Sequence, residues 1–389
     1  MAAALNLFVP MATFGQLHRI PVSTFTVAAS MDKSLATFMA DESYPSFIGA
    51  VRVGQYGYMA GEYGEDDSGL WIYKVDLSTF TYIGACFLDS SLVSSLPAFY
   101  SFNAHEMCAD PAGENLYVQI VVGSEEIGTL AIYKIQLSDF TVIDSIDYTS
   151  AWSSVSAAYY LHDLWACDGT HLYAYSEDAS TSETHLTRFL ASDLSFVDSW
   201  NATTSGYANL SVGVFDSGYL YCGATALGSP NIATLLKFEL TGLTVDDEIT
   251  HSESGSSYND WASSLTLDDG YLYVATAGDG PSGAKSLISK IDLATFTVDT
   301  ADDLNAEEQR YPTAGVIDGG TLYLMSADAV GGSNDLTIYE VDTATLTVTE
   351  HLVPLSDGGY TSATLFLYMY GAAASGIRAR LYPINSPTY

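Results

Sequence analysis

The sequence predicts an all-β fold, a seven-bladed β-propeller of four-stranded antiparallel blades, and three observations lead to that prediction. The chain of 389 residues has 28 tyrosines and many other residues that favour strands, and it shows no long amphipathic helical pattern. Two short phrases recur seven times with one period. A further short apolar run precedes each pair of phrases, which makes four strands in a repeat of about 50 residues.

The first phrase joins a strand to a tight turn, as in SKIDLATFTV from Ser289. Its second residue recurs every 49 to 60 positions and is basic in six of seven copies. The residues are Arg19, Lys74, Lys134, Arg188, Lys237, Lys290 and, in the last copy, Glu340. We interpret the cation as structural, with its stem on the sheet and its head on a carboxylate of a neighbouring strand or blade.

The second phrase, x-Leu-Tyr, recurs with the same period as the first. Its aromatic residue leads the charged one by 15 to 17 positions in copies two to seven, and by 11 in the first. The aromatic residues are Phe8, Tyr58, Tyr117, Tyr173, Tyr221, Tyr273 and Tyr323. Since two independent phrases hold one period, we interpret these residues too as parts of the repeated blade.

The repeat divides the chain into blades of one predicted domain, 1–389. The predicted blades are 5–30 with 360–370, 44–90, 100–150, 157–200, 206–250, 258–302 and 310–355, and 371–389 forms a tail or an extra strand. One blade cannot bury both faces alone, so the blades must pack against one another. The pattern resembles the seven-bladed propellers of the broad WD40-like and YVTN-like classes in architecture and period. No Trp-Asp dipeptide or Tyr-Val-Thr-Asn run stands at the repeat positions, so the resemblance implies a fold and no catalytic residue.

The two ends of the sequence predict how the ring closes. The first copy starts at Phe8 without a strand before it, and TSATLFLYMY, Thr361 to Tyr370, offers a terminal apolar strand. We expect that strand to complete the first blade. Three alternatives stay open: a second C-terminal strand from Arg378 to Ile384, eight blades, or pairing of the terminal strand with another chain.

The charge balance excludes some partners. The net charge is −35, from 47 acidic and 12 basic residues, so nucleic acid and anionic membranes should be repelled. The longest uncharged run, Thr361 to Ile377, is too short to span a bilayer, and we expect no membrane insertion. The four cysteines are scattered and predict buried thiols instead of a disulfide framework.

Aromatic and amide residues recur where the first strand of each blade should begin. They are Tyr44, Asn103, Tyr159, Tyr207, Asn259, Tyr311 and Tyr360. Around the mouth of a central channel they could bind a sugar or peptide. The alternative is that they pack the crossovers between blades.

Two further features carry chemistry. The Asp/Gly-rich loops, such as 61–69 and 277–285, could hold Ca²⁺, although turn chemistry also explains their composition; no other cofactor is predicted. His105 with Glu106, and His162 with Asp163, lie near the inner strands of adjacent blades and could form a metal site or an acid–base pair. Structural or exposed histidines are the alternative.

No linear catalytic motif is present, so we expect a non-enzymatic structural or adhesive propeller. It would stand on the surface of a virion or an extracellular filament or coat, self-associate, and bind proteins or glycans through its loops. A poor secretion signal at the N-terminus favours the virion over ordinary secretion. The alternatives are a propeller enzyme, a lyase or glycan-acting hydrolase with its site at the channel mouth, and a cytoplasmic protein-binding scaffold.

Overall fold

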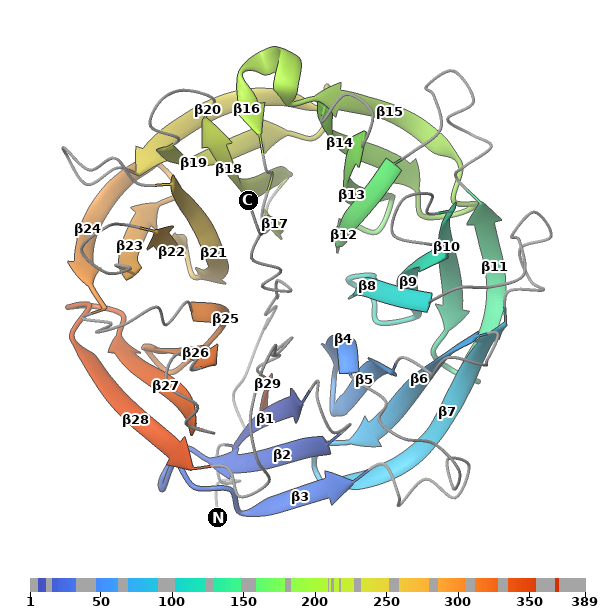
Figure 1. Ribbon diagram of the computed structural model, residues 1–389, viewed down its shortest axis with the longest axis horizontal. Helices are drawn as coiled ribbons and strands as arrows, with labels where there is room; N and C mark the ends of the chain where they lie inside the picture. The colour runs from blue at the N-terminus through green and yellow to red at the C-terminus, as the bar shows by residue number, and fades with distance from the viewer. Residues whose placement is uncertain are drawn as a thin grey trace. The chain divides into compact units, whose positions relative to one another are not determined.

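The fold is an all-β seven-bladed β-propeller, as predicted, with four antiparallel strands in each blade (Figure 1). The structure is a computed structural model. It describes residues 6–11, 16–32, 47–61, 69–89, 102–122, 129–147, 159–178, 183–208, 210, 213–216, 218–226, 232–251, 259–279, 286–304, 312–327, 335–354 and 368–370. Contacts within the chain define two compact units, residues 33–210 and residues 1–32 with 211–389. The prediction of a single domain stays a prediction.

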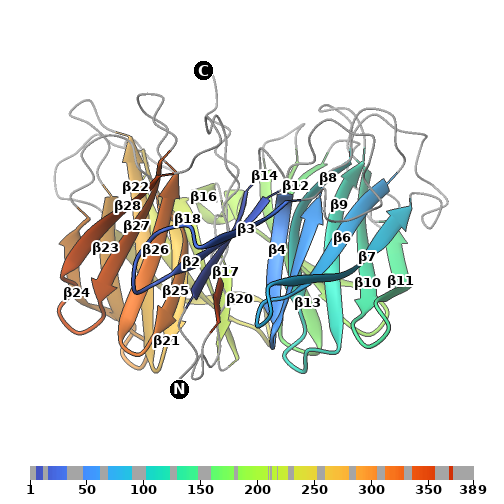
Figure 2. The ribbon, with the colours of Figure 1, turned by 90° about the horizontal axis from the view of Figure 1, so that it is seen from below.

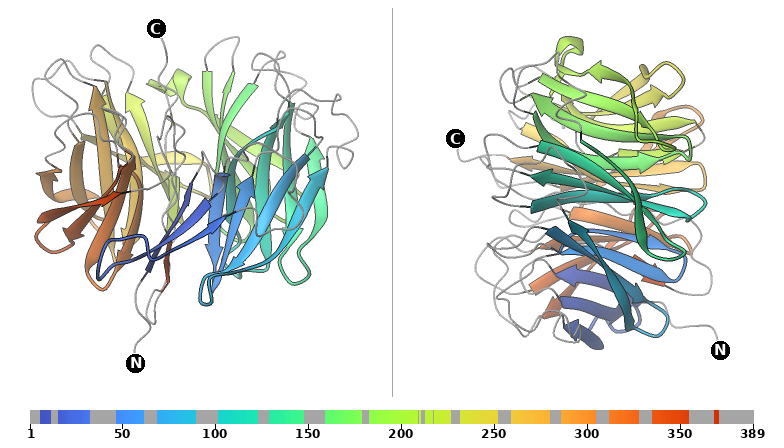
Figure 3. Two further views of the ribbon diagram at one scale, coloured as in Figure 1. Left: turned by 60° about the horizontal axis from the view of Figure 1, so that its bottom comes forward. Right: turned by 90° about the vertical axis from the view of Figure 1, so that its right-hand side faces the viewer.

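The three-bladed unit, 33–210, holds blades 2, 3 and 4. Figure 3 (right) shows its sheets stacked face to face. Blade 2 is β4 (Phe47–Val53), β5 (Tyr56–Gly61), β6 (Gly69–Asp76) and β7 (Thr81–Asp89); blade 3 is β8 (Phe102–Ala109), β9 (Asn115–Val122), β10 (Thr129–Gln136) and β11 (Thr141–Asp147); blade 4 is β12 (Tyr159–Cys167), β13 (His171–Asp178), β14 (Glu183–Leu190) and β15 (Phe196–Asn201). A 3₁₀ turn, Thr203–Ser205, and the short β16 (Tyr207–Ala208) follow.

The four-bladed unit, 1–32 with 211–389, holds blades 1, 5, 6 and 7. Blade 1 is β29 (Tyr368–Tyr370), β1 (Asn6–Met11), β2 (Gln16–Pro21) and β3 (Ala29–Asp32); blade 5 has β17 (Gly213–Asp216), β18 (Tyr219–Ala226), β19 (Ile232–Glu239) and β20 (Thr244–His251); blade 6 is β21 (Asn259–Asp268), β22 (Tyr271–Asp279), β23 (Ser286–Asp292) and β24 (Thr297–Asp303); blade 7 is β25 (Pro312–Asp318), β26 (Thr321–Ala327), β27 (Asp335–Asp342) and β28 (Val348–Pro354).

The terminal strand β29 pairs with β1 and completes blade 1, as the sequence predicts. The pairing is antiparallel, with Leu7 opposite Met369 and Phe8 opposite Tyr368. Leu7 and Phe8 are fully buried, so the first blade has a core of its own. Residues 371–389, the predicted tail or extra strand, lie outside the described residues.

The two sequence phrases are cross-strand partners in every blade. Tyr58 lies opposite Lys74, and the same register holds for Tyr273 and Lys290. The remaining pairs are Phe8 with Arg19, Tyr117 with Lys134, Tyr173 with Arg188, Tyr221 with Lys237 and Tyr323 with Glu340. The separation of the two phrases along the chain, nearly constant in blades 2 to 7 and shorter in blade 1, is therefore the length of the hairpin between the second and third strands.

The turn between the third and fourth strands is also the same in every blade. Its last residue is bulky and has a positive φ, between 46° and 59°: Phe25, Phe80, Phe140, Leu194, Leu243, Phe296 and Leu346. A side chain in this left-handed region costs of order 1–3 kcal/mol. Packing on the preceding blade offsets the cost: the Phe140 ring centroid lies 5.7 Å from that of Tyr58, and that of Phe296 lies 5.9 Å from that of Tyr221.

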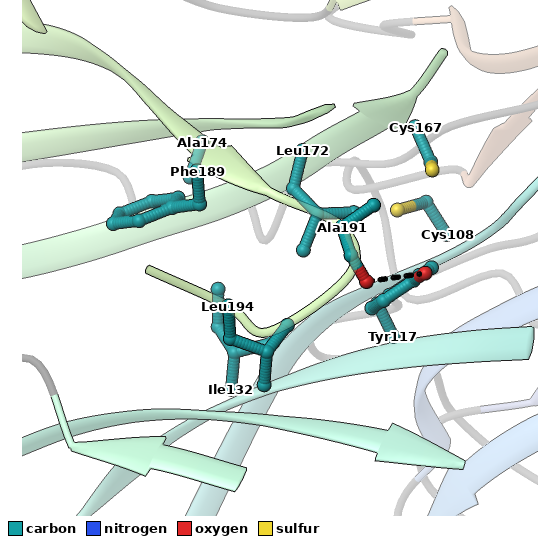
Figure 4. Close-up of a cluster of buried hydrophobic side chains, with 9 residues drawn as sticks. All are labelled: Cys108, Tyr117, Ile132, Cys167, Leu172, Ala174, Phe189, Ala191 and Leu194. Atoms are coloured by element: carbon teal, nitrogen blue, oxygen red, sulfur yellow. Dashed lines mark hydrogen bonds between the residues drawn. The ribbon is translucent and has the colours of Figure 1, made fainter. Parts of the chain in front are cut away.

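The hydrophobic core lies between neighbouring sheets. In Figure 4 the buried cluster between blades 3 and 4 joins Tyr117 and Ile132 to Leu172 and Phe189. Similar clusters lie between blades 5 and 6 and between blades 6 and 7. The four cysteines are buried thiols that form no disulfide, as predicted.

Candidate active site

The repeated tyrosines and cations form contacts between blades. The hydroxyl of Tyr117 donates a hydrogen bond to the carbonyl of Ala191 in the turn of blade 4 at 3.1 Å, and Lys134 Nζ donates to the same carbonyl at 2.9 Å (Figure 4 shows the tyrosine bond). Tyr273 and Lys290 do the same to the carbonyl of Thr343 in blade 7, at 3.2 and 3.0 Å. The pairs thus fasten a blade to its successor.

In blades 4 and 5 the cation contacts a carboxylate of the fourth strand of its own blade, as the sequence analysis expected. Arg188 is bidentate to Asp198 at 2.9 and 2.6 Å, and Lys237 Nζ lies 3.0 Å from Asp246. Lys74 instead lies over the Tyr56 ring, 4.5 Å from its centroid. Burial raises the pKa of Tyr58, Tyr221, Tyr273 and Tyr323 to about 12, which keeps these hydroxyls neutral. A neutral, buried hydroxyl suits a structural donor better than an acid or base at neutral pH.

Blade 7 replaces the cation with a carboxylate and keeps the contact to its neighbour. The carboxylate oxygen Oε2 of Glu340 lies at hydrogen-bond distance, 2.9 Å, from His351 Nε2. The His351 ring stacks on Phe25 of blade 1, with the two ring centroids 3.7 Å apart. The histidine therefore takes the place that the lysine has in the other blades. This histidine therefore belongs to the blade architecture.

The residues predicted to surround the channel mouth fall into two groups. Asn103, Tyr159, Tyr207 and Asn259 lie at the first or second position of β8, β12, β16 and β21. Of these, Tyr207 is half-buried, with its ring centroid 6.0 Å from that of Trp200. Tyr44, Tyr311 and Tyr360 lie outside the described residues. Binding of a ligand at these positions stays a prediction.

A β-bulge occurs at one position of the first strand in five blades. In each of these first strands, one extra residue stands between the two residues that pair with the second and third positions after the repeated tyrosine. The extra residues are Ile48 in β4, His105 in β8, His162 in β12, Ser263 in β21 and Thr313 in β25. Bulges re-aim side chains and are over-represented next to active sites. The bulge row is therefore a place where each blade can present a different chemical group.

Two neighbouring blades place histidine there. The first strands β8 and β12 lie side by side in the three-bladed unit (Figures 1 and 2). In β8 the bulged His105 precedes Glu106, and in β12 the bulged His162 precedes Asp163. The corresponding next residues in blades 2, 6 and 7 are Gly49, Ser264 and Ala314. The histidine–acid pairs are thus specific to blades 3 and 4 within this row.

The bulge in blade 6 shows what a purely structural version looks like. Ser263 is 3% exposed, and its hydroxyl donates to the carbonyl of Ala275 on the neighbouring strand at 3.2 Å. The small side chain is satisfied within its own blade. An imidazole and a carboxylate at the same place bring acid–base chemistry that the bulge itself does not require.

No resident metal centre can be built from the described part of the chain, which contains no group of three or more His, Cys, Asp or Glu placed to hold an ion. Most of the Asp/Gly-rich loops, including 62–68 and 280–285, lie outside the described residues. Calcium binding therefore stays a prediction, as do self-association and glycan binding.

The comparisons with solved structures give the same fold over nearly the whole chain. The periplasmic gluconolactonase of Pseudomonas aeruginosa is 14% identical with a TM-score of 0.57, covering 96% of this chain and 100% of that one. A protein described as a 6-phosphogluconolactonase from Bacteroides fragilis is 14% identical with a TM-score of 0.56, covering 95% and 98%. A third, from Bacteroides uniformis, is 15% identical with a TM-score of 0.53, covering 90% and 97%. No protein-family model and no curated protein sequence matches the chain.

These comparisons correct the functional expectation. The prediction of a non-enzymatic structural or adhesive propeller in a virion, filament or coat is wrong, because the three similar structures named above are described as lactonases. They favour the alternative, a propeller enzyme. The sequence argument used the absence of a linear motif, whereas a propeller assembles a site from side chains that lie about 50 residues apart on different blades.

The comparisons bear on location only in general terms. One of the similar structures is periplasmic, so a place outside the cytoplasm agrees with the extracellular part of the prediction, and nothing supports the virion. Among the described residues, no helix is long and apolar enough to cross a membrane.

Proposed function

We propose that the protein is a propeller hydrolase that opens the ring ester of sugar-acid lactones. The observation that carries the proposal is the pair of histidine–acid dipeptides, His105–Glu106 and His162–Asp163, at equivalent bulges of adjacent first strands. The reaction class is suggested by the gluconolactonase and 6-phosphogluconolactonase descriptions of the structures that share the fold. Fold similarity alone would not choose the chemistry, whereas two acid–base pairs suit ester hydrolysis.

Lactone hydrolysis needs a base and an acid at different points of the substrate. One imidazole would take a proton from water as the water oxygen attacks the carbonyl carbon. The ring C–O bond then breaks, and the second imidazole, protonated, gives its proton to the leaving alkoxide. The product is the open-chain hydroxy acid. Glu106 and Asp163 would orient the imidazoles and stabilise their charged forms.

Purified protein and two single variants test this function. We expect His105→Gln and His162→Gln each to lower kcat for glucono-lactone hydrolysis by about 10²–10⁴-fold, the usual contribution of a general acid or base. The rate is followed in a pH-stat and corrected for spontaneous opening. His171→Gln is the matched control, because this histidine lies in the second strand of blade 4, where its Nδ1 is 3.6 Å from Asp168.

Two outcomes would contradict the proposal. One is wild-type protein that does not accelerate the opening of any five- or six-membered sugar lactone over background. The other is an active wild type whose rate is unchanged in both histidine variants, which would place the site elsewhere.

A further inference from the structure

Gln119, in the middle of β9, is a buried amide that the fold does not explain. Its side chain is 0% exposed, and neither the amide nitrogen nor the amide oxygen has a hydrogen-bond partner in the part of the chain that the structure describes. Burying an amide without partners is unfavourable, and native proteins rarely keep such a group without a role.

The strand register fixes the face on which this amide lies. Gln119 is opposite Glu106 on one side and Ile132 on the other. Cross-strand partners share a face, and so do Tyr117 and Gln119, two residues apart on one strand. Tyr117 and Ile132 both pack on blade 4, in the cluster that includes Cys167 and Leu172 (Figure 4). The amide therefore lies between blades 3 and 4.

Its level along the strand is that of the bulge row. Glu106, its cross-strand partner, directly follows the bulged His105. The equivalent pair in blade 4 is Tyr175 opposite Asp163, which directly follows the bulged His162. Tyr175 lies on the face of blade 4 turned away from blade 3, because Leu172 and Ala174 fill the face toward blade 3. Gln119 thus stands in the interface between blades 3 and 4, at the level of the His105–Glu106 bulge.

Other blades do not need an amide here. The residues two positions after the repeated aromatic residue in the other blades are Pro10, Ala60, Tyr175, Gly223, Ala275 and Met325. Residues from glycine to tyrosine occur at the position, so the architecture does not select glutamine. An amide occurs here only in blade 3, opposite the glutamate that follows the bulged His105.

We propose that Gln119 is a positioning residue for the His105–Glu106 pair. Its amide has two donor hydrogens and an acceptor oxygen, so it can hold a carboxylate and an imidazole N–H at once without adding charge. It would fix the orientation of the acid–base pair of blade 3 from behind. The inference rests on the proposed function, and its test separates the two.

The test compares Gln119→Met with Thr337→Val. Methionine keeps the length of glutamine and removes both polar atoms. Thr337 is also 0% exposed, and its hydroxyl also has no partner among the described residues, but it lies in β27 of blade 7, which belongs to the other compact unit. Since both changes remove a buried unpaired group, we expect both variants to fold with melting temperatures at or above that of the wild type. Gln119→Leu replaces the methionine variant if that one does not fold.

Activity and histidine titration give independent readouts. We expect Gln119→Met to lower kcat for lactone opening roughly 10- to 100-fold with KM unchanged, part of the full effect of losing an acid or base, and Thr337→Val to change neither. In NMR titrations, with the ring signal assigned through His105→Gln, Gln119→Met should shift the pKa of His105, and Thr337→Val should leave it unchanged.

The outcomes distinguish the two proposals. If the wild type opens lactones but Gln119→Met changes neither rate nor titration, the positioning role is overturned and the proposed function stands. If no lactone is opened yet the titration shifts, the proposed function fails and the positioning role stands.

Discussion

Single residues with perturbed titration explain how the tight turns are held. Asp292 Oδ1 accepts hydrogen bonds from the backbone N–H groups of Thr295 and Ala294, each at 2.9 Å, and Asp342 does the same for Thr345 and Ala344. The backbone bond from Thr295 lowers the pKa of Asp292, and that from Thr345 lowers the pKa of Asp342. The carboxylates thus bind the backbone of the turns that end at Phe296 and Leu346, the two residues with positive φ.

The lowered pKa predicts an acid-dependent loss of stability. A folded-state pKa below the unfolded value of 3.8 gives stability that is fully present above pH 3.8 and is lost as pH falls through the folded pKa. We expect the double variant Asp292→Asn/Asp342→Asn to melt below the wild type at pH 7 and to approach it near pH 3. Calorimetry across that range measures the difference. A gap that is as large at pH 3 as at pH 7 would show that the charge is irrelevant.

Among the secondary-structure elements, the repeated hairpin was predictable and the bulge was not. Tyr58 and Lys74 could be recognised as one unit because the spacing between them is nearly constant in the copies that follow. The hairpin before them varies, with residues 54–55 linking β4 to β5 and residues 110–114 linking β8 to β9. His105 therefore lies 12 positions before Tyr117, whereas Ile48 lies 10 before Tyr58. The different spacing in the sequence therefore gives no sign that His105 and Ile48 occupy the same register position.

The candidate site was predictable only in part for the same reason. The histidine–acid dipeptides were visible in the sequence, and their nearness to inner strands of adjacent blades was expected. Gln119 was not, because a glutamine in a strand phrase gives no sign that it is fully buried. Only the cross-strand register places it beside Glu106.

The blade-to-blade contact predicts which part of a lysine matters. Lys290 Nζ donates to the Thr343 carbonyl at 3.0 Å and is 3.9 Å from Asp299, a residue whose side chain is 52% exposed. Buried hydrogen bonds to a charged group contribute about 1.5–3 kcal/mol, whereas exposed ion pairs contribute little. We expect Lys290→Met to lower the free energy of unfolding by roughly 1–3 kcal/mol with lactone opening unchanged, and Asp299→Asn to change stability little. Equal losses in urea unfolding would assign the stabilisation to the ion pair instead.

At the scale of the whole molecule, the charge sets which lactones can approach. The net charge is −35, and of the 12 basic residues Lys134, Arg188, Lys237 and Lys290 are engaged in the blade contacts. A phosphorylated sugar lactone carries negative charge into this field, while an uncharged lactone does not. The proposed hydrolase should therefore act on uncharged sugar lactones, as the name of the periplasmic gluconolactonase suggests for that protein.

The dependence on salt tests this directly. We expect kcat/KM for 6-phosphoglucono-lactone to be at least about 10-fold below that for glucono-lactone at low ionic strength, within the range of electrostatic steering. Raising the salt shortens the Debye length from about 30 Å at 0.01 M to about 8 Å at 0.15 M, so the phosphorylated substrate should gain rate and the uncharged one should not. Stopped-flow pH-indicator assays at matched lactone concentrations measure both. A preference for the phosphorylated lactone at low salt, weakening as salt is added, would instead reveal a local cationic site that outweighs the net charge.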